Sequence, residues 1–167
     1  MTRNATLYRR LQRVGSAVFA IALVAALAAP AEAQSRKWSA SGSGKKIAAT
    51  DCTDCGDDIG MMISCIENGE FGEVIVQWAA SDKGADNTQI ALGIKVDDQV
   101  FDRNANTKLF GQIGYTPQFY ITADDPLLEA LMKGRSVTFN HGGKSTSIAL
   151  TGSGAALERF KAGCGWR

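Results

Sequence analysis

Four cysteines constrain this chain more than any other feature of its sequence. Cys52, Cys55 and Cys65 lie close together, and Cys164 lies almost at the C-terminus. Four cysteines allow three different sets of two disulfides. A disulfide framework is the expected use of these residues only in an oxidising compartment, so the first question is whether the chain is exported.

The first 33 residues have the pattern of a secretory signal peptide. Four arginines and no acidic residue precede an apolar run at residues 14–29, which Pro30 ends. Ala31 and Ala33 flank Glu32 with the small residues that signal peptidase requires, so we expect cleavage after Ala33. The run of 16 residues is shorter than the roughly 20 that span a bilayer. We therefore expect a periplasmic or secreted protein with no membrane span after cleavage.

The rest of the chain has the size of one domain. Removing 33 of the 167 residues leaves 134, with 14 basic and 16 acidic side chains. No basic stripe remains, so nucleic-acid binding is not predicted. We expect residues 34–44, which are rich in serine and glycine, to be a flexible lead-in that Trp38 anchors at its end. Residues 45–167 are expected to form the single domain.

Alternating apolar residues predict a mainly β fold. The clearest strand is 88–96, in which four apolar residues alternate with polar or small ones. Further strands are expected at 45–50, 61–67, 73–80, 99–102, 118–123, 136–140 and 144–151, whereas 103–111 is expected to be polar and irregular. Seven or eight short strands joined by hairpins predict an antiparallel β-sandwich or a flattened barrel.

Two short helices are expected at about 126–133 and 154–162. Asp125 is the expected N-cap of the first helix, and Pro126 suits its first position. Gly134 is expected to end that helix in a left-handed conformation. Ser153 is the expected N-cap of the second helix, whose apolar stripe contains Leu157.

The strand and helix patterns favour one disulfide pairing. Cys65 shares the inward face of its strand, and Cys164 nearly continues the apolar stripe of the last helix. We therefore favour Cys65 with Cys164, a bond that closes a loop of about 100 residues and contributes at most about 4.7 kcal/mol. Cys52 and Cys55 would then close a small ring. We expect this ring to shape an acidic surface loop, which would carry Asp51, Asp54, Asp57 and Asp58.

The Cys52-x-x-Cys55 spacing also allows two alternative functions, a thiol-redox couple or a metal site. Redox chemistry requires a thiol of lowered pKa, and the neighbouring Asp51 and Asp54 oppose a thiolate. The sequence has no second Cys-x-x-Cys pair to complete a zinc site, and its aspartates do not have the spacing of an EF-hand calcium loop. We therefore expect no cofactor or metal, and keep a periplasmic thiol-redox or metal-binding protein as the alternative function.

His141 is the single histidine, so any Ser-His-Asp hydrolase chemistry would depend on it. It lies in an Asn-His-Gly-Gly sequence typical of a hairpin tip, and the sequence has no Gly-x-Ser-x-Gly elbow. We therefore interpret His141 as a turn residue and expect no enzymatic activity.

The C-terminal sequence resembles the invasion-associated locus B family of exported bacterial β-sandwich proteins. Residues 127–139 read LLEALMKGRSVTF, and residues 147–153 read SIALTGS before a short helix. The same ending, with Cys65 early in a strand and Cys164 after the last helix, also resembles the VasI-type accessory proteins of type VI secretion. The resemblance implies a non-enzymatic envelope or secreted protein that engages a protein partner in the envelope or on a host surface.

Overall fold

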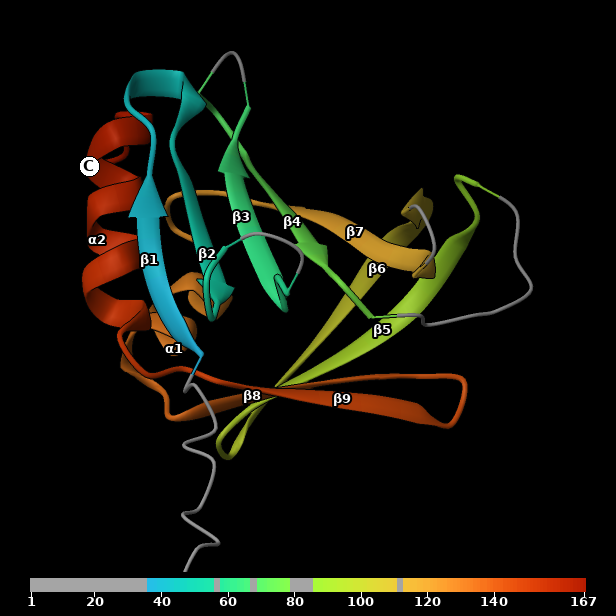
Figure 1. Cartoon of the computed structure of the whole chain (residues 1–167). Helices are drawn as coiled ribbons and strands as arrows, with labels where there is room; N and C mark the ends of the chain where they lie inside the picture. The colour runs from blue at the N-terminus through green and yellow to red at the C-terminus, as the bar shows by residue number, and fades with distance from the viewer. Residues whose placement is uncertain (1–35, 56–57, 67–68, 79–85, 111–112) are drawn as a thin grey trace, which may run out of the picture. The chain divides into compact units, whose positions relative to one another are not determined.

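A computed structural model of the chain describes residues 36–55, 58–66, 69–78, 86–110 and 113–167. All of them belong to the unit Gln34–Arg167. The expected signal peptide and Asp57 lie outside the described residues. The elements of the described residues, in chain order (Figure 1), are β1 (Lys37–Ser41), a short 3₁₀ helix η1 (Gly44–Lys46), β2 (Ala48–Cys52), β3 (Met61–Cys65), β4 (Gly72–Val76), β5 (Gln89–Val96), β6 (Gln99–Phe110), β7 (Gly114–Ile121), α1 (Pro126–Lys133), β8 (Ser136–His141), β9 (Lys144–Ala149) and α2 (Ser153–Cys164).

The strands form one antiparallel sheet in the order β1-β2-β3-β4-β7-β6-β5-β8-β9. The two edge strands approach each other at Trp38 of β1. Its backbone N–H donates to the carbonyl oxygen of Thr151 at 3.2 Å. Its indole Nε1 donates to the carbonyl oxygen of Ala149 at 3.0 Å. The sheet is therefore a nearly closed, flattened barrel, which confirms the predicted fold class of an antiparallel β protein with two short helices.

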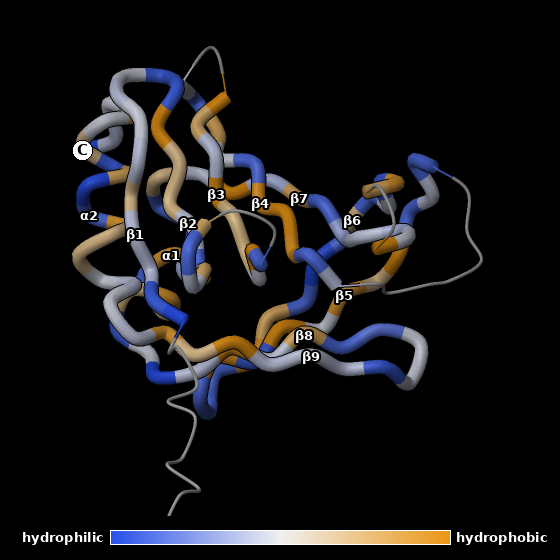
Figure 2. Tube along the Cα trace, in the orientation of Figure 1, coloured by the Kyte–Doolittle hydropathy of each residue, from blue (hydrophilic) through white to orange (hydrophobic). Residues whose placement is uncertain are grey.

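The core lies inside this curved sheet and beneath the helices. α2 contacts β1, β2 and α1, and Figure 1 shows it running beside β1. Figure 2 shows the apolar stretches on β3, β4, β8 and α1, whereas the turn end of the β8–β9 hairpin is hydrophilic. Each large side chain buried here contributes on the order of 1.5–3 kcal/mol. The largest fully buried side chains include Phe139, Phe160, Met61, Ile63, Leu92, Ile94, Ile121, Leu127, Leu128, Leu131 and Leu157.

Helix α1 has the predicted bounds, but its C-terminus differs from the prediction. Asp125 caps the helix by accepting from the backbone N–H of Leu127 at 2.9 Å. Gly134 has φ −75° and is not left-handed. A Cβ at Gly134 would lie 2.6 Å from Val96 Cγ1 and 2.9 Å from the carbonyl oxygen of Ala130. Glycine is needed here because the strand and the helix end approach closely, and not for its left-handed freedom.

Helix α2 begins one residue earlier than expected and ends two residues later. Its N-cap is Gly152, with φ 84°, so the prediction that Ser153 caps the helix is wrong. Ser153 is the first helical residue and is buried. Its hydroxyl lies 2.7 Å from the carbonyl oxygen of Leu131 and 2.8 Å from that of Leu150. This contact ties the start of α2 to α1.

Two segments that were predicted to be irregular are strands. Residues 103–110 belong to the long strand β6, which pairs with β5 on one side and β7 on the other. Residues 37–41 of the expected flexible lead-in form β1, which pairs with β2 along its whole length. Pairing with distant strands overrides the weak strand propensity of both segments. The strand expected at 45–50 divides into η1 and β2.

Candidate functional site

The disulfide Cys65–Cys164 joins the end of β3 to the last residue of α2. The two Cα atoms are 5.7 Å apart, and 99 positions separate the cysteines in the sequence. Both residues are buried, at 8% and 6% exposure. Trp166 extends this contact, because its indole Nε1 donates to the carbonyl oxygen of Gly69 at 2.7 Å. Its ring also meets Phe160 edge to face, with centroids 5.3 Å apart. The C-terminus is therefore fixed to the sheet by covalent and packing contacts.

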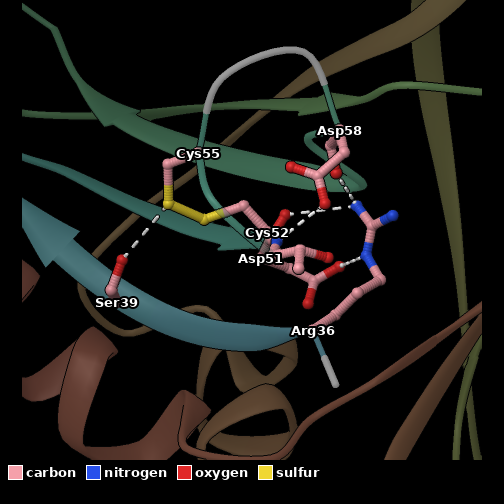
Figure 3. Close-up of a disulfide and its surroundings, with 7 residues drawn as sticks. Arg36, Ser39, Asp51, Cys52, Cys55 and Asp58 are labelled. Atoms are coloured by element: carbon pink, nitrogen blue, oxygen red, sulfur yellow. Dashed lines mark hydrogen bonds and ion pairs between the residues drawn. A yellow bond between two sulfur atoms is a disulfide. The ribbon is translucent and has the colours of Figure 1, made fainter. Parts of the chain in front are cut away.

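The second disulfide, Cys52–Cys55, closes a small ring directly after β2, with Cα atoms 4.9 Å apart. Both pairings are the ones that the sequence patterns favoured. The two cysteines of the ring differ in burial, because Cys52 is 2% exposed whereas Cys55 lies on the surface. Figure 3 shows Cys55 Sγ facing Ser39 of β1, whose Oγ is 3.8 Å away. Cys55 has φ 60°, which is unusual for a residue other than glycine.

Asp51 is fully buried, so its expected place on an acidic surface loop is wrong. In a strand, alternate residues face the same side, and Asp51 follows the buried Ala49 onto the inner face of β2. Its Oδ2 accepts from Arg36 Nε at 3.0 Å. The guanidinium of Arg36 also donates to the backbone carbonyl oxygens of Asp51, at 3.4 Å, and of Asp58, as Figure 3 shows.

The remaining aspartates of the loop have different environments. Asp58 is half-buried, and its Oδ2 accepts from the backbone N–H of Thr53 at 2.8 Å. The hydrogen bonds from Thr53 hold the pKa of Asp58 below its ordinary value. Asp54 is exposed, and Asp57 lies outside the described residues. The structure therefore joins Asp51 and Asp58 through one arginine and leaves Asp54 on the surface.

Burial raises the pKa of Asp51 above its ordinary value, and the charge of Asp58 adds to this effect. The hydrogen bond and positive charge of Arg36 oppose it. The other carboxylate oxygen, Oδ1, is buried and accepts no hydrogen bond from the described residues. Asp51 is thus a buried carboxylate, and the cation of Arg36 stabilises its negative charge.

Gly60 makes room for this ion pair. A Cβ at Gly60 would lie 2.6 Å from Asp51 Oδ2 and 2.7 Å from Arg36 Nη2. Its backbone N–H donates to the carbonyl oxygen of Asp51 at 2.9 Å. Sequence reasoning did not identify Arg36 or Gly60 as site residues. The one sequence signal that could have predicted burial of Asp51 is its position two residues after Ala49, which puts both side chains on the same face of the strand.

His141 lies at the end of β8, where its Nδ1 is 2.8 Å from the carbonyl oxygen of Ala91. The following Gly142 and Gly143 both have positive φ and make the turn to β9. His141 is therefore held against a backbone carbonyl of the neighbouring strand β5.

Three further features of the described residues bear on function. A surface depression of about 270 Å³ lies along α1 and α2, with Leu128 and Met132 among its lining residues. No three histidine, cysteine, aspartate or glutamate side chains of the described ranges gather as ligands of a metal ion would. Within the same ranges, no helix has the length and apolar character needed to cross a membrane.

Comparison with known proteins includes a solved structure of low similarity. No family model matches the sequence. No curated protein sequence matches it either. The crystal structure of invasion associated protein B from Bartonella henselae matches 74% of this chain and 96% of its own, with 14% identity and a TM-score of 0.47. Values this low carry no argument about family or activity, so the functional proposal rests on the chain itself.

Proposed function

We propose that the mature chain is a bacterial envelope or secreted protein that binds a protein or a surface and catalyses no reaction. The observation that carries this proposal is the pairing of all four cysteines in two disulfides. Disulfides persist in the periplasm and outside the cell and are rare in the cytosol. The signal-peptide pattern of residues 1–33 supports the same location.

The roles of the ionisable side chains support binding over catalysis. Asp51 is paired with Arg36, and Asp58 accepts from the loop backbone. Asp125 caps α1 and also pairs with Arg103 at 2.6 Å. His141 contacts a backbone carbonyl oxygen. These groups have the partners expected of groups that stabilise a fold, whereas catalysis needs groups positioned toward a substrate.

The resemblance of residues 127–139 and 147–153 to the invasion-associated locus B family extends the proposal to a host surface. Under this proposal the partner is a protein of the envelope or of a host cell. Recognition would then depend on contact between surfaces, because a non-enzymatic binder needs no reactive group.

Fractionation of a bacterium that produces the full chain tests the proposal. We expect the protein in the periplasm or medium, beginning at Gln34, with no free thiol under non-reducing conditions. The purified chain should then retain a partner from envelope or host-membrane fractions, whereas a heat-unfolded sample should not. Cytoplasmic retention with reduced cysteines would refute export. Turnover of a thiol substrate or a stoichiometric bound metal would favour the alternative function.

A further inference from the structure

The Cys52–Cys55 disulfide does little to hold the loop that contains it. The base of the loop is fixed by contacts that do not involve sulfur, since the Gly60 N–H donates to the Asp51 carbonyl oxygen. Arg36 joins the backbone carbonyl oxygens of Asp51 and Asp58. A disulfide between residues separated by 3 positions also restricts the unfolded chain very little. The bond is therefore largely redundant for stability.

The two sulfurs of this disulfide also differ in access. Cys52 is 2% exposed at the end of β2, whereas Cys55 lies on the exposed part of the loop. Thiol–disulfide exchange requires an incoming thiolate to reach one sulfur, and the sulfur that can be reached decides which bond forms. Attack at this disulfide is thus directed to Cys55. Exposed disulfides are also reduced and exchanged more readily than buried structural ones.

The Cys65–Cys164 disulfide differs from Cys52–Cys55 both in its access to solvent and in its contribution to stability. Its cysteines are 8% and 6% exposed, and it joins residues separated by 99 positions. Trp166 and Phe160 pack face to edge beside this end of α2. The chain therefore contains one inaccessible disulfide that stabilises the fold and one accessible disulfide that the fold hardly needs.

We infer that Cys52–Cys55 is a site of thiol–disulfide exchange, at which a thiolate of a small thiol or of a protein attacks Cys55 Sγ. The bond between the two cysteines breaks, and a new S–S bond forms between Cys55 and the incoming sulfur. The electron pair of the broken bond leaves on Cys52 Sγ, which takes a proton from solvent. The incoming thiol is oxidised as Cys52 is reduced, so no further oxidant is required. This inference goes beyond the proposed function, since an exported binding protein needs no exchangeable bond.

Partial reduction without denaturant tests the inference on the mature wild-type chain. Samples are exposed to rising concentrations of reduced glutathione, or to a reduced Cys-x-x-Cys oxidoreductase, trapped with a maleimide and mapped as peptides. We expect the mixed disulfide on Cys55, a free thiol on Cys52 that the maleimide labels once the trapped sample is unfolded, and an intact Cys65–Cys164 bond. The reagent that exchanges faster identifies the class of thiol. Adducts on Cys52, or opening of both disulfides at one thiol concentration, would overturn the inference.

Single-cysteine variants provide an independent measurement. In Cys52→Ser the thiol of Cys55 is exposed, and in Cys55→Ser the thiol of Cys52 is buried. We expect an aromatic disulfide reagent to react at least ten times faster with the first variant. The Cys52→Ser/Cys55→Ser double variant should melt close to the wild type, which controls for folding. Equal rates in the two single variants, or a large loss of stability in the double variant, would contradict the inference.

Discussion

Replacing Arg36 by glutamine removes the cation that neutralises the buried carboxylate of Asp51. The side chain of Asp51 is 1% exposed and that of Arg36 is 41% exposed. Loss of one partner from a buried ion pair costs roughly 3–5 kcal/mol. Because water reaches Arg36, we reduce this range and expect a loss of about 2–3 kcal/mol at neutral pH. For a domain of this size, the melting temperature should fall by roughly 10 °C.

The loss should depend on pH in a defined direction. Burial raises the pKa of Asp51 in the folded chain, and Arg36 opposes that rise. Between the unfolded pKa near 3.8 and the raised folded pKa, the folded chain binds more protons than the unfolded chain. The stability penalty of Asp51 is therefore absent below about 3.8 and grows as pH rises through this window. Without Arg36 the folded pKa rises further, so the difference between variant and wild type should shrink on acidification.

Chemical denaturation of both proteins from pH 7 to pH 4 measures this difference. Arg135→Gln is the matched control, since Arg135 is 91% exposed and its nitrogen lies 3.9 Å from Asp97. That variant should unfold almost as the wild type does. In an Asp51→Asn background, Arg36→Gln should have much less effect. The reasoning is refuted if Arg36→Gln costs no more than Arg135→Gln, or if its cost is the same at every pH.

Substitutions at Cys164, Trp38 and Gly60 test the remaining contacts through thermal unfolding. Cys164→Ser should lower the free energy of unfolding by about 2–5 kcal/mol, because it opens the Cys65–Cys164 loop across most of the domain. An unchanged melting temperature would show that this disulfide does not constrain the chain. Trp38→Ala should cost about 3–5 kcal/mol, because it removes a buried ring that joins the two edge strands. Trp38→Phe should cost about 1 kcal/mol, because it removes only the indole hydrogen bond. Equal losses in the two variants would contradict this separation of packing from hydrogen bonding. Gly60→Ala should destabilise the chain because its methyl group would overlap the Arg36–Asp51 pair. Gly93→Ala is the control for a general effect of replacing glycine, because a Cβ there would lie 3.7 Å from its nearest neighbour, the carbonyl oxygen of Asn140.

Local signals predicted the elements whose boundaries depend on local contacts. Helix α1 has its predicted bounds because Asp125 and Pro126 act within the first turn. Strand β5 was found because its inward residues are apolar, and Cys65 was placed inward by the same alternation. Signals of this kind need no knowledge of distant residues.

Contacts between distant residues account for the errors. Strand β6 carries polar residues such as Asn104 and Asn106 opposite β5, and only pairing on both edges makes it a strand. Arg36 contacts Asp51 and Asp58, which are 15 and 22 residues away. A single arginine in a serine-rich segment gives no local sign of such partners. The cysteines therefore indicated where the candidate site lies, but no sequence pattern indicated that Arg36 belongs to it.

The two disulfides divide stability and reactivity between different parts of the chain. Cys65–Cys164 and Trp38 fix the C-terminal helix and the two sheet edges, so the domain does not depend on the ring at Cys52. The loop after β2 is held by Arg36, whose hydrogen bonds to Asp51 involve no sulfur atom. Opening the ring should therefore change the surface around Cys55 while the sheet remains folded. A chain whose single reactive bond lies outside its stabilising contacts can exchange thiols in an oxidising compartment without unfolding.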